Sequence, residues 1–242
     1  MTFCASPNSP APLARRLLAA ALLGASLGAH AQSFCASDGQ ARPVRLMERF
    51  TSADCADCWR DPATPAAGPG TVALDWVVPG AQGEDATLSA VATRDALARL
   101  EAVKEAAPAA SRTRVQALQP LAGSRLRVAH GLPVADYLGA SIELKPAPRA
   151  ARQRLTAWLA LVETLPAGLE SSPVERNLVR NLLQRTWGLD KALSKDEQSR
   201  LFESRSMNIA PGAGRERLRV IGWVEDEKGR VRAAAQSRCA AP

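Results

Sequence analysis

The sequence predicts an α+β protein in which an α/β first half is followed by a mainly antiparallel β second half. Thr71–Val78 is mostly apolar, which is typical of a central strand that is covered on both faces. Residues 84–107 are rich in Ala, Leu, Arg and Glu and fit an amphipathic helix in part. Apolar segments with strand-like patterns dominate the chain after about residue 138, and we place a domain boundary there.

The first half contains a short helix between its first two strands. Pro43–Phe50 has a strand-like alternation. Asp54 is suited to cap a helix that begins at Cys55, and the prolines and glycines of residues 62–70 end that helix early. Leu126–Ala129 is a short third strand.

The second half reads mainly as strands. Leu155–Val162 fits a strand or a helix by periodicity alone, and its neighbours favour a strand. The pattern of Asn177–Trp187 does not distinguish a strand from a helix. Leu218–Val224 and Val231–Ala235 predict a hairpin, and the acidic residues 225–227 between them are expected at its solvated tip.

Residues 1–31 have the features of a signal peptide. Arg15 and Arg16 end a stretch without acidic residues, and the apolar run Leu17–Gly28 that follows is too short for a permanent anchor. Ala29-His30-Ala31 matches the small-x-small cleavage pattern. The alternative is a retained N-terminal anchor. We therefore expect a periplasmic or secreted protein with domains over residues 32–138 and 139–242.

Removing residues 1–31 lowers the formal net charge from +7 to +5, because two arginines leave with that segment. The remaining positive charge is spread along the chain without a dense Lys/Arg block, which argues against a nucleic-acid partner. No other apolar run is long enough to cross a membrane, so no stable membrane span is expected. Four tryptophans are expected in packed positions rather than in a ligand site: Trp76, Trp158, Trp187 and Trp223.

Cys55 and Cys58 form a C-x-x-C pair just after a strand-like segment. In an exported protein without a second such pair, thiol–disulfide chemistry is the leading interpretation. Cys55 is the expected nucleophile, since a helix N-terminus favours its thiolate, although Asp54 and Asp57 oppose this effect. Cys58 would then resolve the mixed disulfide. A permanent structural disulfide is the alternative.

A structural metal site needs more Cys and His ligands than the chain offers beside Cys55 and Cys58 after the signal segment. A structural zinc site takes four Cys or His ligands, and His130 is the one histidine that follows the signal segment. A copper site built from Cys55, Cys58 and His130 is the remaining metal alternative. We expect no metal and no cofactor.

Cys35 and Cys239 lie near the two ends of the exported chain, and the termini of domains often lie close together. With Cys55 and Cys58 paired, the even count of four cysteines leaves these two as natural partners for a structural disulfide. Free thiols, or a relay through Cys55 or Cys58, are the alternatives.

The segment Phe50-Thr-Ser-Ala-Asp-Cys-Ala-Asp-Cys58 after a strand resembles the secreted proteins of the domain of unknown function 1223 family. Val72–Val77, Val174–Trp187 and Arg219–Asp226 resemble further segments of that family, in similar order. The resemblance implies a thioredoxin-like α/β domain over residues 32–138, followed by a β-rich domain.

Together these observations predict an exported thiol–disulfide oxidoreductase that acts on a protein thiol or disulfide through Cys55 and Cys58. The alternative is a non-enzymatic envelope protein, with a binding or structural role, on a degenerate thioredoxin-like scaffold. The short helix favours this alternative, as does the lack of a well-placed proline before the third strand, because Pro120 and Pro133 fit that position poorly.

Overall fold

The computed structural model describes residues 1–2, 35–147, 154–188 and 200–239, and the expected signal peptide lies outside them apart from Met1 and Thr2. The described part of the chain holds two α-helices, α2 (Ala56–Arg60) and α3 (Arg94–Ala102). Its strands are β1 (Cys35–Ala36), β2 (Arg45–Ser52), β3 (Thr71–Val78), β4 (Ser111–Ala117), β5 (Arg125–His130), β6 (Tyr137–Lys145), β7 (Leu155–Leu165), β8 (Arg176–Trp187), β9 (Leu201–Asn208), β10 (Leu218–Asp226), β11 (Val231–Gln236) and β12 (Arg238–Cys239).

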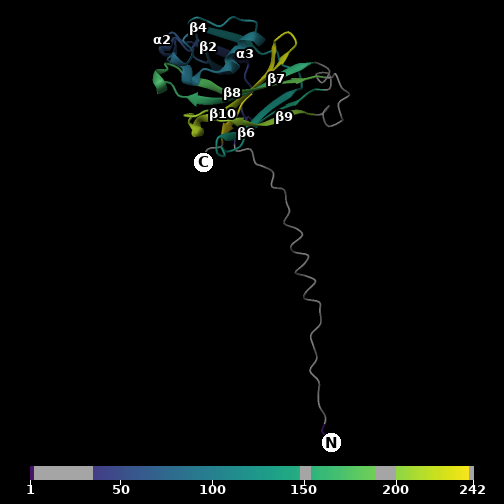
Figure 1. The fold of residues 1–242 in the computed structure, drawn as a ribbon. Helices are drawn as coiled ribbons and strands as arrows, with labels where there is room; N and C mark the ends of the chain where they lie inside the picture. The colour runs from purple at the N-terminus through teal and green to yellow at the C-terminus, as the bar shows by residue number, and fades with distance from the viewer. Residues whose placement is uncertain (3–34, 148–153, 189–199, 240–242) are drawn as a thin grey trace. The chain divides into compact units, whose positions relative to one another are not determined.

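The strands form two sheets (Figure 1). One sheet has seven strands in the order β11-β10-β7-β8-β3-β2-β4, and the other has five in the order β12-β1-β5-β6-β9. Strand β3 runs parallel to both β2 and β8, while the other pairs are antiparallel. Strands from both sides of residue 138 enter each sheet, and Ser33–Pro242 forms one compact unit.

The expected thioredoxin-like α/β domain is wrong. The described residues are mostly β, and the N-terminal strands β2, β3 and β4 belong to the same sheet as four strands of the second half. The physical reason is the length of β7 and β8, which are 11 and 12 residues long, with β7 almost wholly buried and β8 buried over its first four residues. These strands extend the sheet beyond β3, and the five-stranded sheet covers one of its faces where an α/β domain would place helices.

The helix expected over residues 84–107 is much shorter in the structure. Two 3₁₀ turns, Gly83–Asp85 and Ser89–Val91, precede α3. The Oγ1 of Thr93 accepts a hydrogen bond from the amide of Ala96 at 3.3 Å, which caps the helix at residue 93. The amphipathic composition therefore predicted the region of the helix correctly, and the Thr93 cap determines where α3 begins.

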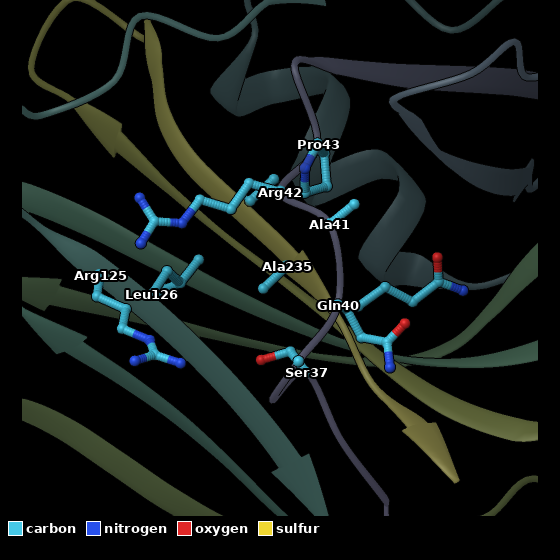
Figure 2. Close-up of a pocket in the computed structure, with 11 residues that line it drawn as sticks. Ser37, Gln40, Ala41, Arg42, Pro43, Arg125, Leu126 and Ala235 are labelled. Atoms are coloured by element: carbon cyan, nitrogen blue, oxygen red, sulfur yellow. The ribbon is translucent and has the colours of Figure 1, made fainter. Parts of the chain in front are cut away.

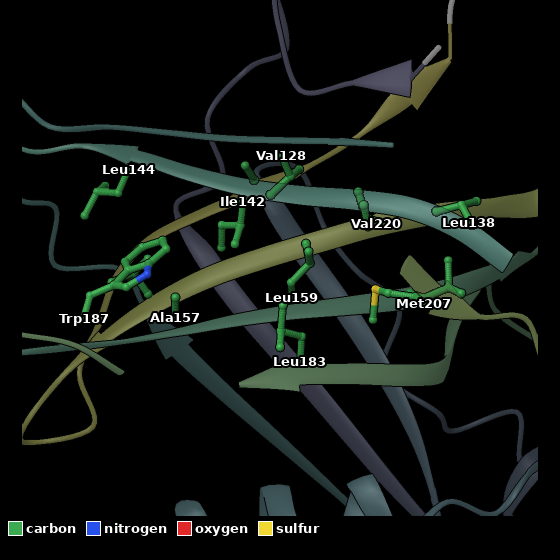
Figure 3. Close-up of a cluster of buried hydrophobic side chains, with 14 of the residues drawn as sticks. Val128, Leu138, Ile142, Leu144, Ala157, Leu159, Leu183, Trp187, Met207 and Val220 are labelled. Atoms are coloured by element: carbon green, nitrogen blue, oxygen red, sulfur yellow. The ribbon is translucent and has the colours of Figure 1, made fainter. Parts of the chain in front are cut away.

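The main core lies between the two sheets (Figure 3). Val128, Leu138 and Ile142 come from the five-stranded sheet, and they meet Leu159 and other apolar residues of the seven-stranded sheet. Alternate residues along β7 face opposite ways, so that one set enters this core and the other set packs on the far face. Both faces of β7 are thus buried.

A second apolar cluster covers the far face of the seven-stranded sheet. Leu100 of α3 packs there with aromatic side chains from β3, β7 and β10. Trp158 and Trp223 stack with ring centroids 5.7 Å apart, and Trp76 meets Trp223 edge to face. The packed positions expected for the four tryptophans are confirmed, because Trp187 is buried in the other core.

The strands expected at residues 155–162 and 218–235 are confirmed, and the open segment at 177–187 is a strand. The expected solvated tip at residues 225–227 is wrong for Glu225 and Asp226, which are buried, while Glu227 is exposed. Glu225 is buried and its carboxylate contacts Arg99 at 2.7 Å, while the same guanidinium contacts Glu48 at 2.6 Å. We call Glu48, Arg99 and Glu225 the Arg99 cluster. It joins β2, α3 and β10 under the stacked rings of Trp158 and Trp223.

The helices of the described ranges are all too short or too polar to cross a membrane. The two disulfides in the structure fit an extracellular or periplasmic setting.

Candidate functional site

Cys55 and Cys58 form a disulfide at the start of α2, with their Cα atoms 5.3 Å apart. Both residues are half-buried, so neither sulfur is sealed in the core. The backbone amide of Cys58 donates a hydrogen bond to the Sγ of Cys55 at 3.3 Å. A donor in this position would also stabilise a thiolate on Cys55 after reduction.

The cap of α2 differs from the expected one. Cys55 is itself the N-cap, while the carboxylate of Asp54 accepts hydrogen bonds from the amides of Ala81 and Gln82 at 2.7 and 3.3 Å. This contact ties the motif to the loop after β3. Gly80 leaves room for this contact, because a Cβ at this position would force the Asp54 carboxylate to shift. The charge of Asp54 is therefore satisfied by the loop.

Trp59 anchors the other end of the motif against the entrance to β8. Its indole N–H donates to the carbonyl of Glu170 at 3.1 Å. The guanidinium of Arg176 lies 4.1 Å from the centroid of its ring and donates to the Trp59 carbonyl at 2.8 Å. The C-x-x-C motif is thus held by contacts that come from more than 100 residues away in the sequence.

Behind the motif lie three buried charges, Arg49, Asp75 and Arg176, which we call the Asp75 cluster. Asp75 accepts two hydrogen bonds from Arg49 at 2.8 Å and one from Arg176 at 2.9 Å. The side chains of all three are at most 3% exposed. Burial lowers the pKa of Arg176 and the charge of Arg49 adds to this, although Asp75 opposes both. Because it has two guanidinium groups and one carboxylate, the Asp75 cluster has a net charge of +1.

That excess charge faces a small hollow of about 90 Å³ beside the motif. Cys58, Arg49 and Arg176 line it together, and Arg112 and Asp61 lie at the same hollow. Positive charge beside a sulfur favours its thiolate. The arrangement can therefore stabilise the reduced form of the pair.

Sequence reasoning missed both buried charge clusters. A signal was present in the apolar strands themselves, since Asp75 interrupts Thr71–Val78 and Glu48 and Arg49 lie within Arg45–Ser52. A charged residue in a strand that is buried on both faces must find a partner of opposite charge. The sequence therefore indicates that each buried charge needs a partner. It does not identify the partners, because they lie 26 to 126 residues away.

Cys35 and Cys239 form the second disulfide, with Cα atoms 3.9 Å apart on the adjacent strands β1 and β12. Cys35 also lies directly opposite His130 of β5. One ring nitrogen of His130 and the two sulfurs lie within 4.8 Å of one another. Among the described residues His130 thus groups with Cys35 and Cys239, and not with Cys55 and Cys58 as the copper alternative required.

A larger hollow of about 210 Å³ lies between the segment after β1, strand β5 and strand β11 (Figure 2). Ser37, Arg42 and Arg125 contribute polar groups to its lining, and Leu126 and Ala235 contribute apolar ones. None of the cysteines in the described ranges lines it. It is therefore separate from the thiol chemistry of either pair.

Comparisons with known proteins leave the family open. No family model matches the chain, and no curated protein matches it. Among solved structures, the chain is similar to HBP35 of Porphyromonas gingivalis, with a TM-score of 0.43 and 11% sequence identity over 82% of this chain and 76% of that one. Similarity at this level carries no argument about fold or function. Membership of the domain of unknown function 1223 family stays a prediction.

Proposed function

We propose that the protein exchanges thiols and disulfides with a partner protein through Cys55 and Cys58. The observation that supports this most directly is a half-buried disulfide whose Cys58 lines a hollow shared with the buried guanidinium groups of Arg49 and Arg176. A disulfide that closes so short a loop contributes little to stability by restraining the unfolded chain. Its surroundings are better explained by chemistry at the sulfur atoms.

The reaction has two steps. In the reduced protein the Cys55 thiolate attacks a sulfur of the partner's disulfide, forming a mixed disulfide and releasing one partner thiolate. The Cys58 thiolate then attacks Cys55, which re-forms the internal disulfide and releases the second partner thiol. Two electrons pass from the protein to the partner. The oxidised form, which the structure shows, runs the same steps in reverse on a partner dithiol.

The local charges assign a role to each sulfur. The Cys58 amide donates to Cys55, which suits the attacking thiolate. Arg49 and Arg176 line the same hollow as Cys58, where their positive charge would favour ionisation of the resolving thiol. Because α2 has only five residues, the helix dipole adds little, and these specific donors replace it.

Equilibration with redox buffers tests the proposal. The full chain is incubated in dithiothreitol buffers of graded potential, alkylated, and mapped by mass spectrometry, so that each disulfide is followed separately. We expect Cys55–Cys58 to titrate above roughly −300 mV and the protein to reduce insulin with dithiothreitol as electron donor. The variant Cys55→Ser is the inactive control. A potential below that value without insulin turnover would identify a structural link.

A matched pair of charge variants tests the role of the hollow. Arg176→Met removes positive charge beside Cys58, so it is expected to raise the thiol pKa values of the pair and lower its reduction potential. Glu225→Gln changes a buried charge in the Arg99 cluster and is expected to leave both values unchanged. Equal shifts in the two variants would show that the potential follows general stability rather than this charge.

Alkylation kinetics test the order of attack. In the reduced protein, a limiting amount of iodoacetamide is expected to label Cys55 before Cys58, and peptide mapping reads the order. Faster labelling of Cys58 would reverse the two roles. If neither cysteine turns over a partner disulfide, the alternative of a non-enzymatic envelope protein is favoured.

A further inference from the structure

Cys239, Cys35 and His130 form one row across three adjacent strands. β1 lies between β12 and β5 in the five-stranded sheet, and Cys35 is directly opposite Cys239 on one side and His130 on the other. Residues that lie directly opposite one another in a sheet project to the same face. Cys35 is fully buried, His130 is 4% exposed and Cys239 is half-buried. Three metal-ligating side chains are therefore gathered at one edge of the sheet, with access from the side of Cys239.

The hydrogen bonds of His130 leave one ring nitrogen ready to bind a ligand. Nδ1 lies 2.8 Å from the carbonyl oxygen of Gly131. A carbonyl only accepts hydrogen bonds, so Nδ1 carries the proton and Nε2 carries the free electron pair. In the described part of the chain, Nε2 is buried and makes no hydrogen bond. Buried polar atoms without a partner are uncommon in folded proteins, and metal-binding histidines commonly fix their tautomer through such a carbonyl.

We propose that the reduced Cys35–Cys239 pair and the Nε2 of His130 bind one Cu(I) ion. In the disulfide form the sulfurs are bonded to each other and the site is closed. A dithiol reductant breaks this S–S bond, supplies two electrons and becomes a disulfide itself. The two thiols then lose their protons as Cu(I) binds between them and the imidazole.

Ligand number and type favour Cu(I) over Zn(II). Thiolates are soft ligands that select Cu(I) and Zn(II), and imidazole suits copper and zinc alike. A structural zinc site takes four protein ligands, whereas this group within the described residues offers three. Cu(I) is stable with three ligands, so this group needs no further protein ligand for Cu(I).

Charge favours the same ion. Two thiolates and Cu(I) carry a net charge of −1, while two thiolates and Zn(II) carry none. Arg219 of β10 lies close enough to His130 for its positive charge to act on the imidazole. The guanidinium of Arg219 donates to the carbonyl oxygens of Glu216 and Leu218, which are uncharged acceptors. A copper–dithiolate centre would add a negative charge beside His130, on which the positive charge of Arg219 acts.

The test uses the full chain with Cys4→Ser, Cys55→Ser and Cys58→Ser, so that Cys35 and Cys239 are the only thiols. After reduction with a phosphine under argon, the protein is titrated with Cu(I) against bicinchoninate. We expect one Cu(I) per chain, and X-ray absorption is expected to show two sulfur ligands and one nitrogen ligand. The same protein with the disulfide intact is the matched control and is expected to leave the copper on the chelator.

Variants within that chain test each ligand. His130→Gln is expected to weaken Cu(I) binding at least about tenfold, which is the loss typical of removing even an outer partner of a metal ligand. Cys239→Ser replaces a half-buried residue at the sheet edge and is expected to abolish competition with the chelator. Circular dichroism verifies that each variant is folded, and Cys35→Ala provides a second thiol variant if Cys239→Ser does not fold.

Three results would overturn the proposal. The first is Cu(I) affinity in His130→Gln equal to that of the reference chain. The second is no Cu(I) retained by the reduced reference chain. The third is stronger competition for Zn(II) than for Cu(I), with four ligands in the absorption spectrum.

Discussion

The Arg99 cluster and the Asp75 cluster have opposite compositions. The Arg99 cluster places one guanidinium between the carboxylates of Glu48 and Glu225, and the indole N–H groups of Trp158 and Trp223 donate to Glu225 at 3.0 and 3.2 Å. Burial alone would lower the pKa of Arg99, but Glu48 and Glu225 outweigh it and raise that pKa. Arg114 approaches Glu48 only to 3.8 Å from the rim. The negative excess is thus absorbed by neutral donors in the core.

The Asp75 cluster has two guanidinium groups for one carboxylate, and its surroundings differ accordingly. Arg49 donates to the carbonyls of Pro65 and Glu175, and Arg176 donates to the carbonyl of Trp59. Carbonyl oxygens balance a positive excess as indole N–H groups balance a negative one. One difference remains, since the Asp75 cluster opens on the hollow that Cys58 lines. The comparison suggests that the Arg99 cluster is structural and that the Asp75 cluster serves the cysteines.

Removing the single opposing charge is expected to cause the largest loss of stability in either cluster. Arg99→Met leaves two buried carboxylates, and Asp75→Asn leaves two buried guanidinium groups. Each is expected to lower the free energy of unfolding by about 3–5 kcal/mol, as measured by urea denaturation. Asp57→Asn, at an exposed carboxylate, is the control. A loss below about 1 kcal/mol in Arg99→Met would mean that the carboxylates are not held together by this guanidinium.

Removing one of the two like charges is expected to cost less, because a neutral pair remains. Arg176→Met leaves Arg49 with Asp75, and Glu225→Gln leaves Arg99 with Glu48. Each is expected to lower the free energy of unfolding by about 1–3 kcal/mol, which is the worth of the charged hydrogen bonds that are lost. Urea denaturation beside the previous two variants tests the ranking. A larger loss for Glu225→Gln than for Arg99→Met would reverse our interpretation of the cluster.

Lowering the pH is expected to remove the stabilisation that a carboxylate beside the Arg99 cluster supplies. Burial would raise the pKa of Asp226, but hydrogen bonds from Arg230, Arg232 and the adjacent amides outweigh it and lower that pKa from 3.8 to about 2. Since the folded pKa is the lower one, the stabilisation is present above pH 3.8 and is lost as the pH falls from there toward 2.

The expected loss is on the order of 2 kcal/mol, measured as the change in free energy of unfolding between pH 5 and pH 2.5. Asp226→Asn should show a change smaller by about that amount over the same range. Identical pH profiles for the two proteins would contradict the prediction.

The smallest effect is expected at the exposed ion pair beside the motif. Arg60 contacts Asp57 at 2.8 Å, but their side chains are 56% and 95% exposed. Arg60→Ala is expected to change the free energy of unfolding by less than about 0.5 kcal/mol. A larger change in thermal unfolding would show that charge near α2 matters for folding even at the surface.

Local patterns predicted several strands, but not β4 or β9, and they did not predict the charge clusters. The hairpin of β10 and β11 follows from two apolar runs separated by a turn, and both signals lie within 20 residues of sequence. By contrast, Glu225 looked like part of a charged turn, because its partner Arg99 lies 126 residues away. The thioredoxin-like arrangement was wrong for a related reason, since the pairing of β3 with β8 is not encoded near either strand.

The candidate site likewise has features that the sequence predicted and features that it did not. The position of Cys55 and Cys58 after a strand was visible in the sequence, and the pairing of Cys35 with Cys239 followed from the even cysteine count. The cap was not visible, because Asp54 bonds to a loop 27 residues later instead of capping α2. The group of Cys35, Cys239 and His130 was not visible either, since it depends on the register of three strands.

The Cys35–Cys239 disulfide also changes the topology of the molecule. Its two cysteines are separated by 204 positions, so the bond converts nearly all of the described chain into a covalent ring. A protease that cuts once inside this ring releases no fragment, because the two pieces remain joined through the sulfurs. An unfolding machine that threads a single strand through a narrow pore would have to accommodate two strands at once. Reduction of the Cys35–Cys239 disulfide therefore determines whether the chain can be unfolded and degraded from one terminus as a single strand.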